Sequence, residues 1–379
     1  MKINFSLGKE WSELKKFEKL SDDERSIVFY AENKASMNHF RLLIKHLTEK
    51  LNFKICYVTS IKDDPIFSDN NVNINSFFIG DGTVRTKFFL TLKAKILIMD
   101  MPDLETYHIK RSKVFPVHYI YIFHSMFSIH SYLRKGAVDN FDTIFCVGEH
   151  HEKEIREIER IYKLKEKNLV RYGFGRLDYL LDEKENYKEV TNDEKLIIIA
   201  PSYGENNLLE KCGIELIDNL LKSEFKVLLR PHFKILKDSK KLIDKINEKF
   251  QSNPNFELET SIISKDVFHG SKCLISDWSG ISFEYAFVSE KPVIFIDVPE
   301  KILNKEFMKI GLEPLEISIR EKIGRVVSID RLNEISDVIE KMHSKSVNDE
   351  IKKIRSETVF NIGKSAEIGS EYIKKILYS

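Results

Sequence analysis

A polar turn near residue 280 joins a short apolar run to a predicted helix and could hold a phosphate. The apolar run is Cys273–Ser276, and the helix is predicted over Ile281–Val288. The hydroxyls of Ser279 and Ser282 would join the first unbonded N–H groups at the positive end of the helix, and Gly280 would let a ligand approach the backbone closely. The same residues fit an ordinary helix start with Ser279 as the cap. The turn therefore indicates either an anion site or a plain strand-to-helix connection.

A second group, Arg230-Pro-His232, comes directly after the apolar run Lys226–Leu229. An arginine offers a planar fork that fits phosphate oxygens, and His232 could donate a hydrogen bond or a proton to a leaving phosphate. The structural alternative is that Arg230 pairs with a carboxylate and His232 caps a loop. Ser202 lies in a similar position after the run Lys195–Ala200, and on its own it is a weak signal.

In the first half of the chain, the candidate for proton transfer is His124, which comes after the apolar run Val117–Phe123. A histidine at a strand end suits a general base that takes a proton from an acceptor hydroxyl. A hydrogen-bonded core histidine is the competing interpretation. Polar and basic residues around this stretch could attract an anionic acceptor, although solvated surface charges are the default; they are Arg111, Lys113, Ser125 and Arg134.

Apolar runs alternate with helical patterns along the chain, which is typical of doubly wound α/β domains. The alternation restarts after the charged stretch Glu183–Glu194, the predicted linker. We therefore expect two Rossmann-like domains facing across a ligand cleft, with candidate residues where strands end. The expected boundaries are an acceptor domain at 1–190, a nucleotide domain at 191–350, and a C-terminal helix at 351–379 that crosses back. Tyr172–Asp178 is predicted as a glycine hinge, and no G-x-G-x-x-G opens a helix anywhere.

Composition excludes several classes of protein. The chain has 379 residues, and 60 basic against 59 acidic side chains give a net charge of +1, so no global field attracts nucleic acid. Four widely spaced cysteines and a start without an apolar core predict a reducing cytosol rather than export. Val114–Leu133 has the length of a membrane span, but its histidines, serines and proline favour a buried strand, loop and helix.

Taken together and in order, these motifs resemble the CDP-glycerol glycerophosphotransferase family, the polyol-phosphate transferases of teichoic-acid type, including shorter members of capsule and surface-polysaccharide systems. The resemblance covers roughly 27–372 and rests on five motifs: Phe123-His-Ser125, Gly175–Asp178, Ala200–Tyr203, Arg230–His232 and Ser276–Glu284. Two of them depart from the commoner family pattern. His124 is followed by Ser125 rather than glycine, and the turn reads Asp-Trp-Ser-Gly rather than Asp-Tyr-Ser-Ser.

The resemblance implies a GT-B fold, with the nucleotide held mainly by the C-terminal domain. By position, His124 matches the histidine that activates the acceptor hydroxyl. His232 and Arg230 match residues that meet the donor diphosphate and ease departure of CMP. The resemblance also implies a phosphate-binding turn, in which the donor is contacted by Asp277, Ser279, Gly280 and Ser282. Glu284 would hold a ribose hydroxyl, and Ser202 would form another wall of the cleft.

The implied reaction is in-line attack by an acceptor hydroxyl on the β-phosphorus of CDP-glycerol or CDP-ribitol, with CMP leaving. We predict no metal site, because no Asp-x-Asp pair stands where a GT-A enzyme would hold one. The expected partner is a lipid-linked or capsular glycan, with peripheral contact at the inner membrane face. Two alternatives stay open: a GT-B glycosyltransferase that uses a UDP- or CMP-sugar, and a binding protein that has the fold without the chemistry.

Overall fold

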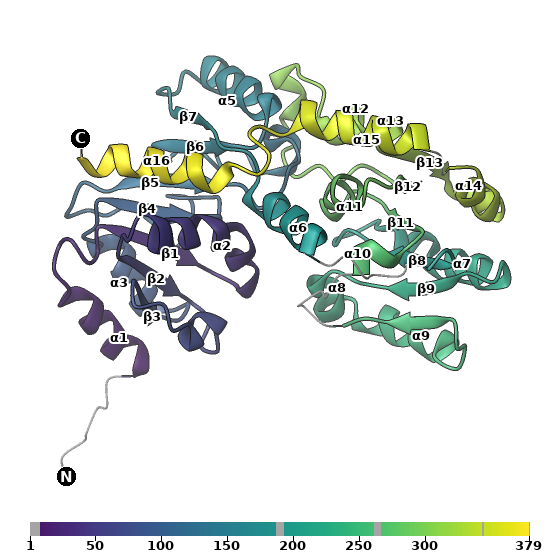
Figure 1. The fold of residues 1–379 in the computed structure, drawn as a ribbon, viewed down its shortest axis with the longest axis horizontal. Coiled ribbons are helices and arrows are strands. Elements are labelled where there is room, and N and C mark those ends of the chain that lie inside the picture. Colours follow the sequence, from purple (N-terminus) through teal and green to yellow (C-terminus); the bar gives the residue numbers. More distant parts are fainter. Residues whose placement is uncertain (1–7, 187–192, 261–266, 343–344, 379) are drawn as a thin grey trace, which may run out of the picture. The chain divides into compact units, whose positions relative to one another are not determined.

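The computed structural model describes residues 8–186, 193–260, 267–342 and 345–378. The chain separates into two compact units, which Figure 1 shows with their elements labelled. Unit 1 comprises Met1–Tyr179, Leu303–Leu312 and Thr358–Ser379, and unit 2 comprises Leu180–Ile302 and Glu313–Glu357. Each unit therefore contains segments that are distant in sequence.

Unit 1 contains a parallel sheet of seven strands in the order β3-β2-β1-β4-β5-β6-β7. The first six positions reproduce the Rossmann order, in which the chain reverses direction across the sheet between its first and fourth strands. In chain order the strands are β1 (Ile27–Ala31), β2 (Ile55–Thr59), β3 (Ile74–Phe78), β4 (Ile96–Met99), β5 (His118–Ile122), β6 (Thr143–Cys146) and β7 (Asn168–Arg171).

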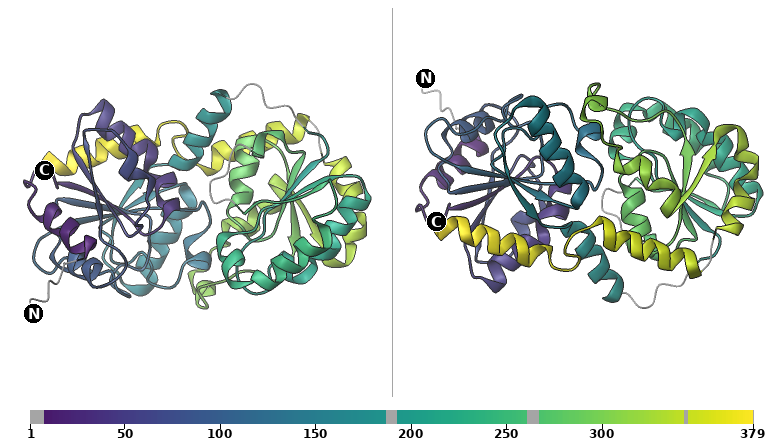
Figure 2. Two further views of the ribbon diagram at one scale, coloured as in Figure 1. Left: turned by 90° about the horizontal axis from the view of Figure 1, so that it is seen from below. Right: turned by 90° about the horizontal axis from the view of Figure 1, so that it is seen from above.

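Helices cover both faces of this sheet, as the two views in Figure 2 show. The helices of unit 1 are α1 (Lys9–Glu18), α2 (Met37–Lys45), α3 (Thr83–Thr91), α4 (Ile129–Tyr132), α5 (Glu149–Tyr162) and α16 (Ser365–Tyr378), with short turns at η1 (Lys34–Ser36), η2 (His46–Lys50), η3 (Pro65–Ser68) and η4 (Phe307–Ile310). The strands β1, β2 and β4 are almost wholly buried, which explains their continuous apolar sequences.

Unit 2 repeats the same topology. Its six parallel strands lie in the order β10-β9-β8-β11-β12-β13, which is again the Rossmann order when counted from β8. The strands are β8 (Leu196–Ile199), β9 (Lys226–Leu229), β10 (Phe256–Leu258), β11 (Cys273–Ser276), β12 (Val293–Asp297) and β13 (Gly324–Ser328). The predicted fold class, two Rossmann-like domains, is thereby confirmed at the level of the two sheets.

The helices of unit 2 differ in how deeply they are buried. Every residue of α11 from Ser282 to Val288 is buried, so this helix is surrounded by protein on all sides. By contrast, α9 is amphipathic and buries only Ile243, Ile246 and Phe250. The helices are α7 (Leu208–Lys222), α8 (Phe233–Asp238), α9 (Lys240–Phe250), α10 (Val267–Gly270), α11 (Ile281–Ser289), α12 (Leu315–Ser318), α13 (Arg320–Ile323), α14 (Ile335–Lys341) and α15 (Lys345–Thr358), with η5 (Ile329–Glu334); α6 (Gly175–Asn186) connects the two units in sequence.

Segment Thr358–Tyr378 returns the chain to unit 1. The Phe360 N–H donates to the Val147 carbonyl at 2.8 Å, so the returning backbone docks where β6 ends. The yellow helix α16 then runs beside α2 (Figure 1), where the His46 ring and the Ser370 hydroxyl are 2.9 Å apart. Gly173 has a φ of +95° and packs so closely that an added Cβ would lie 2.3 Å from the Phe360 carbonyl oxygen. The glycine predicted as a hinge therefore makes room for the returning segment.

Several sequence expectations are refined by the structure. The stretch Val114–Leu133 contains β5 and the short helix α4, which confirms it as a buried strand and helix. The edge strands β7 and β13 were not predicted from the sequence. The predicted linker Glu183–Glu194 begins inside α6, which extends to Asn186, and its positions 187–192 lie outside the described residues. None of the helices within the described ranges combines the length and apolar character needed to span a bilayer.

Candidate functional site

In unit 2, the predicted donor residues lie just past the carboxyl ends of β8, β9 and β11, which form one edge of a parallel sheet. The order reverses between β8 and β11, and ligands of open α/β sheets bind outside such a reversal. Arg230 and Ser279 therefore lie at the same edge, two strand positions apart, at about 5 Å per strand. The motifs of the second half thus follow strands that end at one edge of the sheet.

Asp277 ties two parts of this edge together. Its carboxylate accepts the N–H of Ser202 at 2.6 Å and the N–H of Leu208 at 2.9 Å. Burial raises the pKa of Asp277, while the amide hydrogen bonds and the Ser202 hydroxyl oppose that rise. The Ser276 hydroxyl adds a bond of 2.6 Å to the Ala200 carbonyl. Asp277 and Ser202 thus hold the two strand ends in register, so we assign Asp277 a positioning role.

The start of α11 presents only part of the predicted phosphate seat. The Ser282 hydroxyl is fully buried and donates to the Ser279 carbonyl at 2.7 Å, so it serves the helix start. The first amide bond of the helix is Ser282 N–H to the Ser279 carbonyl at 3.0 Å, so the N–H groups of Gly280 and Ile281 precede the hydrogen-bonded ladder. Ser279 is half-buried, and Glu284 is buried in the first turn. Of the predicted seat, the Ser279 hydroxyl and the N–H groups of Gly280 and Ile281 are the donors that the helix start does not use itself.

Arg230 points toward the β10 side of the edge. Its Nε lies 3.5 Å from a carboxylate oxygen of Glu259, and its guanidinium carbon is 5.9 Å from the centroid of the Phe268 ring. The Arg230 side chain is only 13% exposed. The ion pair that the sequence allowed is thus present, and it holds a largely desolvated guanidinium at the end of β9.

His232 caps α8, as the structural alternative anticipated. Its Nδ1 accepts the N–H of Lys234 at 3.2 Å, so in the neutral ring the proton is on Nε2. The imidazole stacks on the ring of Tyr203 with 4.6 Å between centroids. Burial, followed by the charges of Lys301 and Lys234, lowers the pKa of His232 to about 4. At neutral pH, His232 is therefore an uncharged Nε2–H donor.

Two lysines complete this edge, and the sequence analysis did not single them out. The Nζ of Lys301 lies 3.2 Å from the centroid of the Tyr203 ring, and the Nζ of Lys234 lies 4.2 Å from it. Lys301 comes four residues after the end of β12. The rule that pointed to Arg230, which considers the polar residues just past the end of each strand, would also have found Lys301.

In unit 1, His124 lies just past the end of β5, next to the end of β4. Its Nδ1 is 3.2 Å from the main-chain carbonyl of Asp100 and 3.3 Å from the Tyr121 hydroxyl. A carbonyl oxygen only accepts hydrogen bonds, so the geometry assigns the proton to Nδ1 and the basic lone pair to Nε2. This is the tautomer that a general base needs.

Buried titratable groups surround His124. The ring of His39 lies 6.4 Å away, and burial, Arg176 and His124 lower its pKa well below the ordinary range. The Asp100 carboxylate accepts from the Ser36 hydroxyl at 2.9 Å, and burial raises its pKa to about 7. His124 thus lies at the carboxyl edge of unit 1, one strand from the reversal between β1 and β4, and His232 lies one strand from the reversal of unit 2.

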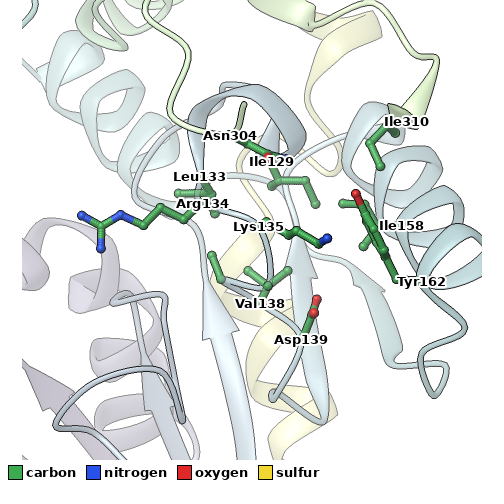
Figure 3. A pocket seen from close by; sticks show the side chains of 12 residues that line it. Ile129, Leu133, Arg134, Lys135, Val138, Asp139, Ile158, Tyr162, Asn304 and Ile310 are labelled. Carbon is green, nitrogen blue, oxygen red and sulfur yellow. The ribbon is translucent and has the colours of Figure 1, made fainter. Parts of the chain in front are cut away.

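The predicted acceptor residues divide between the two edges of this sheet. Arg134 stacks on Tyr107 at 5.4 Å and lowers the pKa of Asp103, which burial raises, so it lies near the carboxyl edge. Ser125, next to His124, accepts the N–H of Phe127 at 3.3 Å. Figure 3 shows the Arg134 side chain pointing away from an adjoining cavity of about 20 Å³, which is too small for a substrate.

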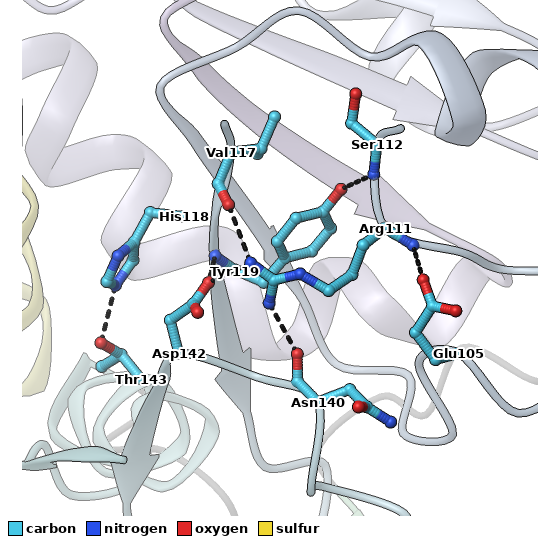
Figure 4. A network of polar contacts seen from close by, with 9 residues as sticks. All are labelled: Glu105, Arg111, Ser112, Val117, His118, Tyr119, Asn140, Asp142 and Thr143. Carbon is cyan, nitrogen blue, oxygen red and sulfur yellow. Dashed lines mark hydrogen bonds and ion pairs between the residues drawn. The ribbon is translucent and has the colours of Figure 1, made fainter. Parts of the chain in front are cut away.

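Arg111 lies at the opposite, amino-terminal edge of the sheet (Figure 4). Its guanidinium donates to the carbonyls of Asn140 at 2.7 Å and Val117 at 3.2 Å and pairs with Asp142 at 2.9 Å. Lys113 is on the same segment and lies 3.7 Å from Glu105. Strand β5 separates this network from His124 by roughly 15 Å. The structure therefore does not bring Arg111 and Lys113 together with His124.

Comparison with known proteins places these observations in a family. The sequence profile described as CDP-Glycerol:Poly(glycerophosphate) glycerophosphotransferase matches residues 14–301. The teichoic acid ribitol-phosphate polymerase TarL of Staphylococcus aureus (strain NCTC 8325 / PS 47) is 28% identical over 203 residues, which cover 49% of this chain and 34% of TarL. The chain thus matches only about a third of the length of this curated relative.

Solved structures share the fold at low identity. The wall teichoic acid polymerase TagF, in a structure with CDPG, gives a TM-score of 0.54 at 14% identity and covers 98% of this chain and 94% of that one. The S. aureus MnaA–UDP structure gives a TM-score of 0.60 at 13% sequence identity and covers 93% of this chain and 97% of that one. The structure of a UDP-GlcNAc 2-epimerase of Methanocaldococcus jannaschii with UDP-GlcNAc and UDP gives a TM-score of 0.57 at 15% sequence identity. The match covers 93% of this chain and 99% of that one. At these identities the likeness shows the GT-B fold alone.

Proposed function

Because this chain belongs to the CDP-glycerol:poly(glycerophosphate) glycerophosphotransferase family, we propose that it transfers a polyol phosphate from a CDP-activated donor to a hydroxyl of a glycan acceptor and releases CMP. The observation that carries this proposal is the carboxyl edge of unit 2. An uncharged Nε2–H donor, a desolvated guanidinium and a helix start follow β9 and β11 along this one edge, on either side of β8. Such an edge suits a nucleoside diphosphate.

In the proposed reaction, a new bond forms between the acceptor oxygen and the β-phosphorus of the donor. The bond between that phosphorus and the bridging oxygen breaks, and CMP leaves with the electron pair. The proton of the acceptor hydroxyl goes to Nε2 of His124, whose Nδ1–H is held by the Asp100 carbonyl. Transfer of this kind depends on positioning and charge neutralisation more than on covalent help.

We assign the donor contacts by position. Arg230 and the Nε2–H of His232 stabilise charge on the diphosphate, and Ser279 with the N–H groups of Gly280 and Ile281 holds a terminal oxygen. Glu284 holds a ribose hydroxyl. Asp277, Ser202 and Ser282 keep the strand ends and the helix start in place. His232 need not give up a proton, because CMP leaves as a phosphate monoester whose second pKa is only about 6.

The donor is proposed to be CDP-glycerol, with CDP-ribitol as the second polyol to be tested, since a ribitol-phosphate polymerase is among the relatives. The acceptor is proposed to be a lipid-linked or capsular glycan at the inner face of the membrane, approached from the cytoplasm, with Ser125 and Arg134 near the attacking hydroxyl. A nucleotide-sugar glycosyltransferase is less well supported, because the family profile covers residues 14–301 whereas the epimerases share only the fold.

The test is a donor panel. Purified protein is incubated with CDP-glycerol, CDP-ribitol, a CMP-sugar or UDP-GlcNAc, with and without glycan acceptors, and release of CMP or UDP is monitored. The proposal predicts acceptor-dependent CMP release from a CDP-polyol and thermal protection by CDP. Release of UDP from UDP-GlcNAc, or failure of both CDP-polyols with every acceptor, would overturn it.

A further inference from the structure

The loop after β12 is anchored by the aromatic residue of the Asp-Trp-Ser-Gly turn. The indole N–H of Trp278 donates to the Val298 carbonyl at 3.0 Å, and the Arg320 guanidinium covers the indole ring at 4.0 Å. Arg320 also donates to the Ile296 carbonyl at 3.4 Å. The tryptophan that departs from the commoner family pattern therefore fixes the backbone that leads to Lys301.

At the end of this loop, Lys301 joins a cluster of cationic and aromatic groups. Tyr203 is shared by three neighbours: the His232 ring at 4.6 Å, the Lys301 ammonium at 3.2 Å and the Lys234 ammonium at 4.2 Å. Within the described residues, neither lysine forms an ion pair with a carboxylate. The nearby Asp277 attracts Lys301, but its oxygens already accept two amide N–H groups.

Two ammonium groups on one ring repel each other, and the partly buried Lys301 is less well solvated than the exposed Lys234. An anion placed between them would remove this cost. His232 cannot provide the positive charge, because its ring is neutral at physiological pH. The cluster adjoins the ends of β8 and β9, where the donor diphosphate is proposed to lie.

We propose that Lys301, assisted by Lys234, is a substrate-binding residue that neutralises the diphosphate of the nucleotide donor across the Tyr203 ring. This inference rests on the proposed function for the identity of the donor, but its chemistry requires only a diphosphate. Lys301 supplies a positive charge at the β12 side of the edge, and Arg230 supplies one at the β10 side.

The ionisation of Lys301 agrees with this role. Burial lowers its pKa to about 8, with Asp277 opposing the change and Lys234 adding to it. The other titratable groups close to Lys301 are Tyr203 and His232. A bound diphosphate would restore the charge, so binding should take up a proton near pH 8. Diphosphate affinity should therefore fall as the pH rises through about 8.

The experiment measures binding to the full chain by calorimetry, with CDP, inorganic pyrophosphate and cytidine as probes. Lys301→Met should weaken the affinity for CDP and for pyrophosphate about 10- to 100-fold and leave the affinity for cytidine unchanged. Lys301→Arg should recover most of the affinity for CDP and pyrophosphate. Lys237→Met, an exposed lysine on the same helix as Lys234, is the matched control and should behave as wild type. The wild-type affinity for CDP should decline above about pH 8, and Lys301→Met should lack that decline.

Unchanged CDP affinity in Lys301→Met would overturn the inference. An equal loss of affinity for CDP and for cytidine would overturn it as well. If Lys301→Met does not fold, a CDP affinity of the wild type that is flat through pH 8 overturns it, and a decline there supports it. Failure of the proposed function looks different: wild type would bind CDP and pyrophosphate in a lysine-dependent way without turning over any CDP-polyol. If wild type binds neither probe, the Lys301 inference is wrong whatever the reaction is.

Discussion

The imidazole of His232 lies face to face with the phenol ring of Tyr203, with 4.6 Å between centroids and 28° between ring planes. The stack and the cap bond from the Lys234 N–H fix both the plane and the tautomer of the ring. Together they orient Nε2–H, the only donor that the neutral ring can offer a ligand. An aromatic side chain after β8 thus sets the chemistry of a histidine after β9.

Substitutions of His232 should separate the roles of its two nitrogens. In His232→Gln the amide N–H replaces Nε2–H, and the loss of kcat/KM should be about 10-fold; His232→Asn keeps only the position of Nδ1, and the loss should be about 100-fold or more. Steady-state CMP release measures both. Equal losses in the two variants would contradict the assigned tautomer.

The protonation of His232 also predicts how stability and kcat/KM depend on pH. Its pKa in the folded protein is lowered from 6.5 to about 4, so the unfolded chain binds more protons between these values. Its contribution to stability is therefore lost as the pH falls from about 6.5 toward 4, and kcat/KM should show no His232 limb between pH 5 and 8. An acidic limb near pH 6.5 that disappears in His232→Gln would contradict a neutral ring.

Asp100 should lower stability at neutral pH. Burial raises its pKa from 3.8 to about 7, so folding holds a proton that the unfolded chain has already released. The cost begins above about pH 4 and is complete above pH 7. Asp100→Asn keeps an acceptor for the Ser36 hydroxyl, and should stabilise the protein by about 2–4 kcal/mol at pH 8 and by little at pH 4.5.

Urea unfolding at the two pH values measures this difference. Asp81→Asn, at an exposed position, is the control and should show no such pH-dependent gain. A gain for Asp100→Asn that is the same at both pH values would show that the carboxyl group is not protonated by burial.

Gly173 should resist substitution because of the returning segment. An alanine there would adopt a φ of +95° and place its Cβ 2.3 Å from the Phe360 carbonyl oxygen. Backbone strain costs about 1–2 kcal/mol, and displacing the segment should bring the loss of unfolding free energy to about 3 kcal/mol or more. Gly363→Ala has a φ of +78° but meets nothing within 4 Å, so it measures strain alone. Equal losses in the two variants, measured by thermal or urea unfolding, would mean that the contact with Phe360 contributes nothing.

The sequence predicted the strands well where they are buried on both faces. Runs such as Ile27–Ala31 and Cys273–Ser276 are continuous and apolar because helices cover both sides, and this pattern is hard to mistake. The edge strand Asn168–Arg171 was missed because its residues are partly exposed and polar at both ends. Return of the chain to unit 1 through Leu303–Leu312 depends on contacts between distant segments, which no local pattern contains.

The candidate site was predicted as residue types and edge positions, but not as contacts. The rule that ligands collect at strand ends brought Ser202, Arg230 and Asp277 to one edge. The same rule could not tell that the hydroxyl of Ser282 would turn back to the Ser279 carbonyl. Nor could it tell that Arg111, although only thirteen positions before His124, lies before β5 and so at the other edge. Side-chain direction depends on packing, which spacing alone does not fix.

The central claim is that His124 is the base that activates the acceptor. The direct measurement compares CMP release from CDP-glycerol plus acceptor in wild type, in His124→Asn, whose amide can still donate to the Asp100 carbonyl, and in the exposed control His108→Asn. We predict that His124→Asn loses about 100- to 10,000-fold in kcat with unchanged affinity for CDP, while His108→Asn keeps full activity. Turnover by His124→Asn within a few-fold of wild type would contradict the claim.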